Sequence, residues 1–256
     1  SSMIPRLHHY QDLKKCLGED TNNTNIKNGQ IYILRKGEPI NKNRYGILPI
    51  DISKLLKTNI EQGYIGYQSG YLRKGINHDG CSFLNAICDI LSCDKINLKI
   101  DLIKIKKILI EKLNENIFRT LYSSNLENIF KNPASNKSAM DNFKEYILNE
   151  PTLNHTYLWD YLQRENILYD NGLNIFIFEN DNLLCPFGEN VGNFYDTSKN
   201  SILLIKHKIY YEPIYYLQGT GKTAIISCIF PYVKEEIKKI FELSKEGCKT
   251  SYNIRW

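Results

Sequence analysis

The chain has 256 residues, with 33 lysines and arginines against 28 aspartates and glutamates, so its formal net charge is +5. This length suits one large domain or a core with an appendage, and a composition of 42% hydrophobic and 24% charged residues excludes global disorder. No apolar run approaches the roughly 20 residues needed to cross a bilayer, so we expect no membrane span. The mild positive charge is spread along the chain and does not indicate a nucleic-acid partner.

The chain contains seven cysteines, an odd number, and its first residues lack the apolar core of a signal peptide. An odd number of cysteines without a secretion signal indicates free thiols in a reducing compartment. We therefore expect reduced cysteines and a cytoplasmic location.

The N-terminal third contains few regular elements. A short strand is predicted over residues 30–34, and Asp51 is the expected N-cap of a helix over 52–56. Five glycines between residues 59 and 80 predict a loop with turns; they are Gly63, Gly66, Gly70, Gly75 and Gly80.

Two helices are predicted next. From Cys81 onward, apolar residues recur at steps of three and four, which indicates a buried helical stripe: Phe83, Leu84, Ile87, Ile90 and Leu91. A longer helix is predicted over 98–121. Four lysines lie mostly off its apolar face, namely Lys104, Lys106, Lys107 and Lys112. Such a face can contact nucleic acid, but a solvated helix surface is far more common and is our interpretation.

The second half changes from helical to strand periodicity. Ser138 and Asp141 have capping-box spacing ahead of one helix, and another is predicted over 156–165. Strands follow over 174–179, 201–206 and 209–216, the last two as a hairpin, and a further strand over 224–230 precedes a final helix. Pro213 inside the hairpin predicts an edge or bulged strand. Helices before strands favour an α+β fold over a doubly wound sheet.

The segment with the most chemical content surrounds Cys81, which follows Gly80 at the start of a predicted helix. The N-terminus of a helix stabilises a thiolate, and its free N–H groups can donate to an oxyanion. Asp79 is expected to orient a partner or to shape the turn. The alternative is that Cys81 is a small buried side chain, which is the more common situation for a free cysteine.

A thiolate nucleophile needs a base, and the chain has five histidines. His8 and His9 lie in the terminal segment, His78 is too close in sequence to reach back easily, and His155 precedes a helix. His207 falls between two predicted strands, from which a sheet can present it to the cysteine helix. The alternative for His207 is a surface-turn histidine.

These residues carry a resemblance to the OTU family of papain-like deubiquitinases, whose catalytic helix opens with an Asp-Gly-x-Cys-x-Phe segment. The residues Asp79-Gly80-Cys81-Ser82-Phe83 are similar to it, with one residue fewer between glycine and cysteine. The resemblance covers about residues 70–220 and extends to OTU-like domains in proteins of large DNA viruses. It implies an α+β papain-like core, with helices packed on a small, mostly antiparallel sheet. We assign an N-terminal extension packed on the core to 1–62, the OTU-like core to 63–220, and a C-terminal strand and helix extension to 221–256.

The resemblance implies a cysteine-dependent isopeptidase that acts on ubiquitin, polyubiquitin or a ubiquitin-like modifier. In this interpretation Cys81 is the nucleophile, His207 is the base, and Asp79 or Glu212 is the orienting acid. It further implies a monomer that needs neither a cofactor nor a metal and, for a viral protein, a place in the host cytoplasm.

A gap-free alignment with the family motif gives a second interpretation. Ser82 then occupies the nucleophile position, and Tyr210 occupies the position of the base. Serine forms no thiolate of lowered pKa and tyrosine is a poor base at neutral pH, so this alignment implies a catalytically inactive OTU-like module that binds ubiquitin or another protein. We favour the first interpretation from the sequence, because it keeps both residue types that the reaction requires.

Overall fold

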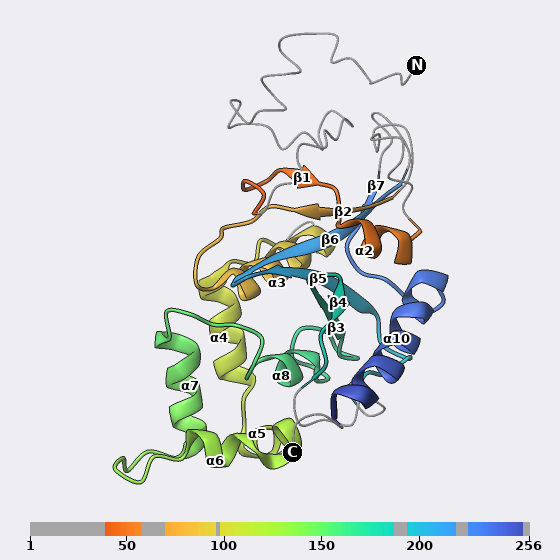
Figure 1. The fold of residues 1–256 in the computed structure, drawn as a ribbon. Coiled ribbons are helices and arrows are strands. Elements are labelled where there is room, and N and C mark those ends of the chain that lie inside the picture. Colours follow the sequence, from red (N-terminus) through yellow and green to blue (C-terminus); the bar gives the residue numbers. More distant parts are fainter. Residues whose placement is uncertain (1–38, 58–69, 96–97, 187–193, 219–224, 253–256) are drawn as a thin grey trace, which may run out of the picture.

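The computed structural model describes residues 39–57, 70–95, 98–186, 194–218 and 225–252 (Figure 1). The strand predicted over 30–34 lies outside these residues, as do Gly63, Gly66, His8 and His9.

The described elements alternate between one sheet and the helices around it. The strands are β1 (Tyr45–Gly46), β2 (Gly70–Lys74), β3 (Asn174–Glu179), β4 (Asn182–Leu183), β5 (Ser201–His207), β6 (Tyr210–Gln218) and β7 (Ile225–Ser227). The helices are α2 (Ile50–Leu55), α3 (Ser82–Asp94), α4 (Leu102–Lys112), α5 (Glu115–Thr120), α6 (Leu126–Phe130), α7 (Ala139–Asn149), α8 (Trp159–Gln163) and α10 (Glu235–Tyr252), with a short 3₁₀ turn η2 (Leu121–Ser124).

The strands form one sheet in the order β1-β2-β6-β5-β3-β4, with β7 also paired to β6. The pair β3 and β5 is parallel, and the other described pairs are antiparallel. Strand β6 pairs with β5 over residues 210–214 and with β7 over residues 216–218, while β2 lies along its other side. The prediction of an α+β fold is confirmed.

Two predictions about strands were wrong. Gly70–Lys74 was expected to be loop and instead forms β2, which pairs with β6; glycines at or beside both ends of this short strand hid its pattern. Pro213 was expected on an edge or bulge, yet β6 is interior to the sheet. The pairing of β6 with β2 begins at Ile214, so the proline, which has no N–H, lies one residue before that ladder.

The predicted helices are present at the expected positions, but their lengths differ from the prediction. The long helix predicted over 98–121 is divided into α4 and α5, because the Asn114 side chain accepts a hydrogen bond from the N–H of Ile117 and caps a new helix. Ser138 caps α7 through the N–H of Asp141, as the capping-box spacing predicts. Helix α2 has Pro49 at its N-cap, so Asp51 lies inside the first turn and not at the cap.

The lysine face of α4 is tied to the protein's own oxygen atoms. Lys104 donates to Lys99 O, Lys106 to Leu148 O and Lys112 to the carbonyls of Asn166 and Ile167, while Lys107 pairs with Glu111. These contacts agree with the interpretation of this face as an ordinary solvated helix surface.

The sheet is covered on both faces, with α3 and α10 on either side of it (Figure 1). Phe83 of α3 packs against Tyr211 on one face, and Phe241 of α10 packs against Phe176 on the other. The core also includes buried residues of the predicted extensions, such as Ile52. The described parts of 1–62 and 221–256 therefore share one core with the rest, and the domain boundaries stay a prediction.

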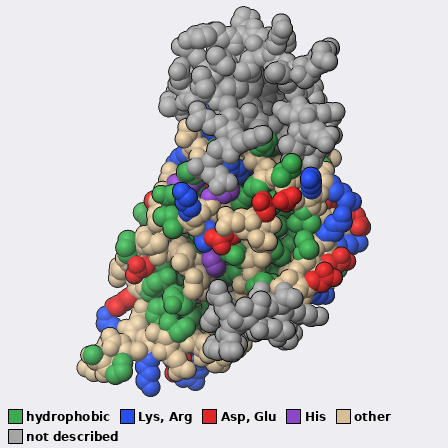
Figure 2. All heavy atoms as spheres, viewed as in Figure 1, with side chains coloured by type: hydrophobic (Ala, Val, Ile, Leu, Met, Phe, Trp, Pro, Cys, Tyr) green, Lys and Arg blue, Asp and Glu red, His purple; other side chains and the backbone are tan. Residues whose placement is uncertain are grey.

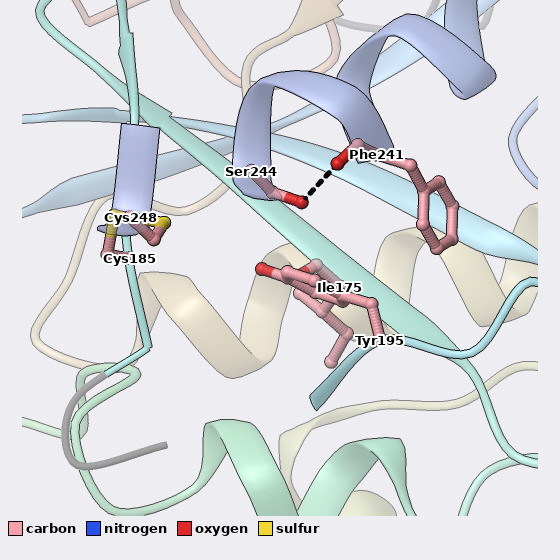
Figure 3. Close-up of a disulfide and its surroundings, with 6 residues drawn as sticks. All are labelled: Ile175, Cys185, Tyr195, Phe241, Ser244 and Cys248. Atoms are coloured by element: carbon pink, nitrogen blue, oxygen red, sulfur yellow. Dashed lines mark hydrogen bonds between the residues drawn. A yellow bond between two sulfur atoms is a disulfide. The ribbon is translucent and has the colours of Figure 1, made fainter. Parts of the chain in front are cut away.

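A disulfide joins Cys185, which follows β4, to Cys248 in α10 (Figure 3). The expectation that all seven cysteines are reduced is therefore wrong for this pair. The number of cysteines could not predict this bond, because an odd total excludes only that all cysteines are paired. The two side chains are 63 residues apart in the chain and meet only in the folded structure. The described free cysteines are Cys81, Cys88, Cys93 and Cys228.

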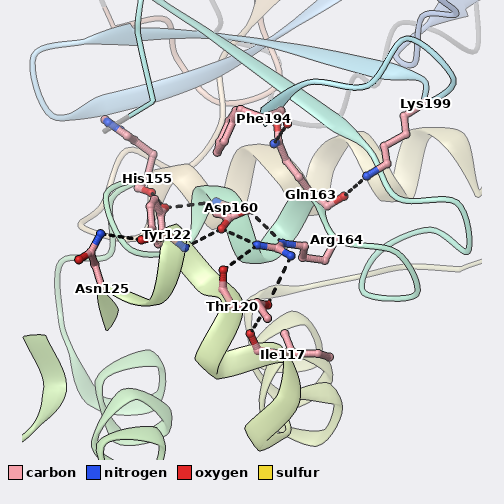
Figure 4. Close-up of polar contacts among 10 residues, drawn as sticks. All are labelled: Ile117, Thr120, Tyr122, Asn125, His155, Asp160, Gln163, Arg164, Phe194 and Lys199. Carbon is pink, nitrogen blue, oxygen red and sulfur yellow. Dashed lines mark hydrogen bonds and ion pairs between the residues drawn. The ribbon is translucent and has the colours of Figure 1, made fainter. Parts of the chain in front are cut away.

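A buried carboxylate supports an unusual turn between the helices. Three consecutive residues in η2, Tyr122, Ser123 and Ser124, have positive φ, a conformation that costs roughly 1–2 kcal/mol per residue. Asp160 accepts the N–H of Tyr122 at 2.8 Å and two hydrogen bonds from Arg164, at 3.0 and 2.9 Å (Figure 4). The carboxylate thus holds the turn in place from helix α8.

We expect Asp160→Ala to lower the free energy of unfolding by about 3 kcal/mol, because it leaves the buried N–H of Tyr122 and the guanidinium of Arg164 without this acceptor. Urea unfolding followed by fluorescence of the buried Trp159 measures this loss. Glu165→Gln, at an exposed neighbouring position, is the control and should change the value by less than about 0.5 kcal/mol. A similar stability for Asp160→Ala and the control would contradict this role.

Candidate functional site

The turn before α3 is held by Asp79. Its Oδ1 atom accepts the N–H of Cys81 at 2.8 Å and the side-chain amide of Asn85 at 3.0 Å. Of the two roles expected for Asp79, these contacts are those of a residue that shapes the turn. Cys81 is the N-cap of α3, so the sequence placed the start of this helix correctly.

The thiol of Cys81 is covered by the segment that precedes α8. Its side chain is buried, and Sγ lies 3.8 Å from the carbonyl oxygen of Pro151. Leu153 donates its N–H to Gly80 O, and a Cβ atom on Gly80 would lie 2.2 Å from Pro151 O, so the two backbones approach closely here. A carbonyl oxygen accepts a hydrogen bond but cannot remove the thiol proton.

Ser82 faces the hairpin between β5 and β6. Its hydroxyl accepts the N–H of Tyr211 at 3.1 Å and donates to the carbonyl oxygen of Ile209 at 3.5 Å. The side chain is 1% exposed. These two partners flank Tyr210, so the structure brings together the two positions that the gap-free alignment assigns to nucleophile and base.

The other predicted site residue, His207, belongs to a buried cluster around the carboxylate of Glu212. Arg73 of β2 donates from Nη1 to Glu212 Oε1 at 2.7 Å, and His207 Nε2 lies 3.3 Å from the same oxygen. The second oxygen, Oε2, accepts the N–H of Ile40 at 3.2 Å and lies 3.6 Å from His78 Nε2. Glu212 is completely buried, so its charge depends on these partners.

The electrostatics of the cluster keep Glu212 ionised. Burial by itself raises the pKa of this carboxyl, but the hydrogen bonds from His207 and His78 and the charge of Arg73 outweigh burial and lower the pKa to about 2. His207 Nε2 also lies 3.1 Å from Arg73 Nη1. A protonated Nε2 donates to Glu212, whereas an unprotonated Nε2 accepts from Arg73 and places the proton on Nδ1.

His207 lies on the face of the sheet that points away from α3, the helix that Cys81 caps. Tyr211 of β6 contacts Phe83 of α3, and successive residues of a strand alternate between faces. Glu212 therefore points away from α3, and His207, whose register partner is Tyr210, shares the face of Glu212. In the part of the chain that the structure describes, none of the hydrogen bonds of Cys81 involves a histidine. The structure brings His207 together with Glu212 but not with Cys81.

His155 lies in the core beside Tyr211, with its Nδ1 atom 2.5 Å from the hydroxyl. Burial, followed by the charge of Lys206, lowers the pKa of this histidine to about 4, so it is neutral at pH 7. It also packs edge-on against Phe83 and Trp159. No local pattern predicts this pairing, because Tyr211 is 56 residues away in the chain.

Arg73 is the residue of this cluster that sequence reasoning missed. Its strand was expected to be a loop, and a charged residue in a loop is normally solvated. The available signal was the pattern Tyr71-Leu72-Arg73, in which two apolar residues precede the arginine in a stretch too short to show alternation. A fully buried arginine needs a carboxylate partner, and Glu212 provides it.

The described residues offer no group of three or more histidine, cysteine, aspartate or glutamate side chains that could hold a metal ion. Within the same residues, no helix is both long and apolar enough to cross a membrane.

No protein-family model matches the chain. The chain is similar to an uncharacterized protein of Acanthamoeba polyphaga mimivirus, at 22% identity over 263 residues. The match covers 90% of this chain and 16% of the viral protein, so the chain spans about a sixth of that relative's length. The relative is viral, in line with the resemblance to domains of large DNA viruses.

We expect the stability of the wild type to depend on the charge of Glu212 in acid. The folded-state pKa of about 2 lies below the ordinary value of 4.5, so the ionised form stabilises the fold above pH 4.5 and this contribution is lost as the pH falls toward 2. Between pH 5 and pH 2 the wild type should lose about 3 kcal/mol more than Glu212→Gln, which has no such titration.

Urea unfolding at a series of pH values measures this difference. Glu246→Gln, at an exposed position in α10, is the control and should follow the wild type. Equal slopes of stability against pH for the wild type and Glu212→Gln would refute the assignment.

Proposed function

We propose that this chain is a non-catalytic OTU-like module that binds ubiquitin, and that it forms part of a larger viral protein. The observation that carries the proposal is the hydroxyl of Ser82. In the gap-free alignment this residue takes the place of the nucleophile, and both of its hydrogen-bonding roles are filled by the main chain of the β5–β6 hairpin.

A nucleophilic serine needs a base that accepts its proton. The proton of Ser82 instead points to the carbonyl oxygen of Ile209, and the position expected to hold the base is Tyr210. Tyr210 packs against His78, edge to face, with 5.4 Å between the ring centroids. These contacts are those of a structural joint between α3 and the hairpin.

The partner is proposed from the family resemblance and from one exposed side chain beside this joint. Ile209, at the tip of the hairpin, is 62% exposed although it is apolar. Its carbonyl oxygen bonds to Ser82, so Ile209 lies beside the position that the gap-free alignment assigns to the nucleophile. We take this exposed apolar side chain beside Ser82 as the proposed docking point for ubiquitin.

A cysteine-dependent isopeptidase remains the second candidate, and the pair of His207 and Glu212 favours it. A histidine held by a buried carboxylate is an arrangement that general bases use. This candidate requires Cys81 as the nucleophile, and it requires His207 and Cys81 to come together from their present faces of the sheet.

Binding is tested by titrating isotope-labelled ubiquitin with the wild type and with Ile209→Asp. We expect the wild type to shift ubiquitin resonances, and Ile209→Asp to weaken the affinity at least tenfold, because it places a charge in an apolar contact. Ile225→Asp is the matched control, since Ile225 is also 62% exposed but lies at the other end of β6, about 30 Å away. Equal effects of both variants, or no shift with the wild type, would exclude ubiquitin docking at the hairpin.

Catalysis is tested with a ubiquitin probe that carries a C-terminal electrophile. We expect no labelling of the wild type, and none of Cys81→Ala or Ser82→Ala. Labelling of the wild type that disappears in Cys81→Ala and persists in Ser82→Ala would overturn the proposal and establish the isopeptidase.

A further inference from the structure

Two of the free cysteines lie together near the end of α3. Cys93 is in the last turn of this helix, and Cys228 follows β7, 135 residues later in the chain. The Sγ atom of Cys228 lies 3.6 Å from the carbonyl oxygen of Ile90, one helical turn before Cys93. The neighbouring Cys93 thiol has the largest influence on the pKa of this thiol, and the reverse also holds, so the two side chains interact.

The two thiols differ in accessibility and in acidity. Cys93 is half-buried, whereas Cys228 is buried. The interaction with Cys228 outweighs burial and the charge of Asp89 and lowers the pKa of the Cys93 thiol, and the charge of Lys74 adds a smaller lowering. The same interaction, with burial, raises the pKa of Cys228. Cys93 is therefore the attacking sulfur and Cys228 holds the proton.

Cys88, the other free cysteine within α3, shows the effect of burial on a thiol. It lies five residues before Cys93 and is buried in the core, and burial raises the pKa of its thiol to about 12. Cys88 is therefore inert at neutral pH.

We propose that Cys93 and Cys228 are a redox-active dithiol that small-molecule disulfides of the glutathione class oxidise reversibly to an intramolecular disulfide. The Cys93 thiolate attacks one sulfur of the small disulfide, forms a mixed disulfide and releases one small thiolate. Cys228 then loses its proton, and its thiolate attacks Sγ of Cys93 and releases the second small thiolate. One disulfide is consumed and one is formed, so two electrons pass from the protein to the small disulfide.

Cys228 lies close to the start of the C-terminal helix α10. Cys228 lies seven residues before the start of α10, and the bond between Cys185 and Cys248 attaches the other end of this helix. A second bridge at Cys228 would fix the chain to α3 just before α10 begins. In the oxidised protein α10 would be attached near both of its ends. Reduction of the bond between Cys93 and Cys228 would release the N-terminal end of the helix.

The test uses the wild-type chain, reduced with a phosphine, freed of reductant and exposed to oxidised glutathione. Remaining thiols are alkylated, and the protein is digested with trypsin. We expect a peptide in which residues 75–95 are linked to residues 223–234, and its loss after treatment with dithiothreitol.

Residues 75–95 also contain Cys81 and Cys88, so variants identify the partner of Cys228. The linked peptide should be absent from Cys93→Ser and present in Cys88→Ser, the matched control in the same helix. The proposal is overturned if the wild type gives only alkylated or glutathione-bound peptides, or if the link persists in Cys93→Ser. The absence of the link in the wild type overturns the proposal even where a variant fails to fold, and fragmentation of the linked wild-type peptide identifies which of the three cysteines is joined to Cys228.

Discussion

The carboxylate of Glu212 is the constraint on which the centre of the structure depends. It is completely buried and accepts hydrogen bonds from Arg73 of β2 and from the N–H of Ile40, and it lies close to the rings of His78 and His207. One charged group thus joins strands β2, β5 and β6 to two connecting segments. An ion pair of this kind adds little stability over apolar side chains of the same shape, but the loss of one partner leaves a buried charge. The pairing therefore fixes which segments meet at this end of the sheet.

The two faces of β6 carry side chains of different kinds. The face toward α3 carries Tyr211 and Tyr215, which contact Phe83 and Asp89 of that helix. The opposite face carries Glu212 and, through the register of the hairpin, His207. A strand cannot turn a single side chain to the other face without a bulge or a change of register, and either would break the pairing of β5 and β6. The histidine that the sequence offers as a base is therefore held by the sheet and by Arg73, on the side away from the cysteine helix.

The sequence predicts this fold best where a local pattern carries the information. The stripe of α3, the cap at Ser138 and the runs of β3 and β5 follow from spacing alone, and each is present. Prediction failed for β2, because five residues beside glycines show no period, and for the disulfide, because its partners meet only in the fold. The candidate site depends on the same kind of non-local information. Cys81 was placed correctly at a helix start, but which face of a sheet a distant histidine occupies depends on a register that one sequence does not reveal.

The choice between Cys81 and Ser82 is then a choice between two neighbouring residues at the start of one helix, which point about 100° apart around its axis. Only one of them can face the hairpin, and the hydrogen bonds to Ile209 and Tyr211 assign that direction to Ser82. Cys81 consequently turns toward Pro151. If Cys81 were to face the hairpin, the helix would have to rotate and give up both serine contacts, together with the packing of Phe83 on Tyr211. The direction of a cysteine at a helix start is therefore set by the contacts of its helix neighbours, here Ser82 and Phe83, and not by the residue type alone.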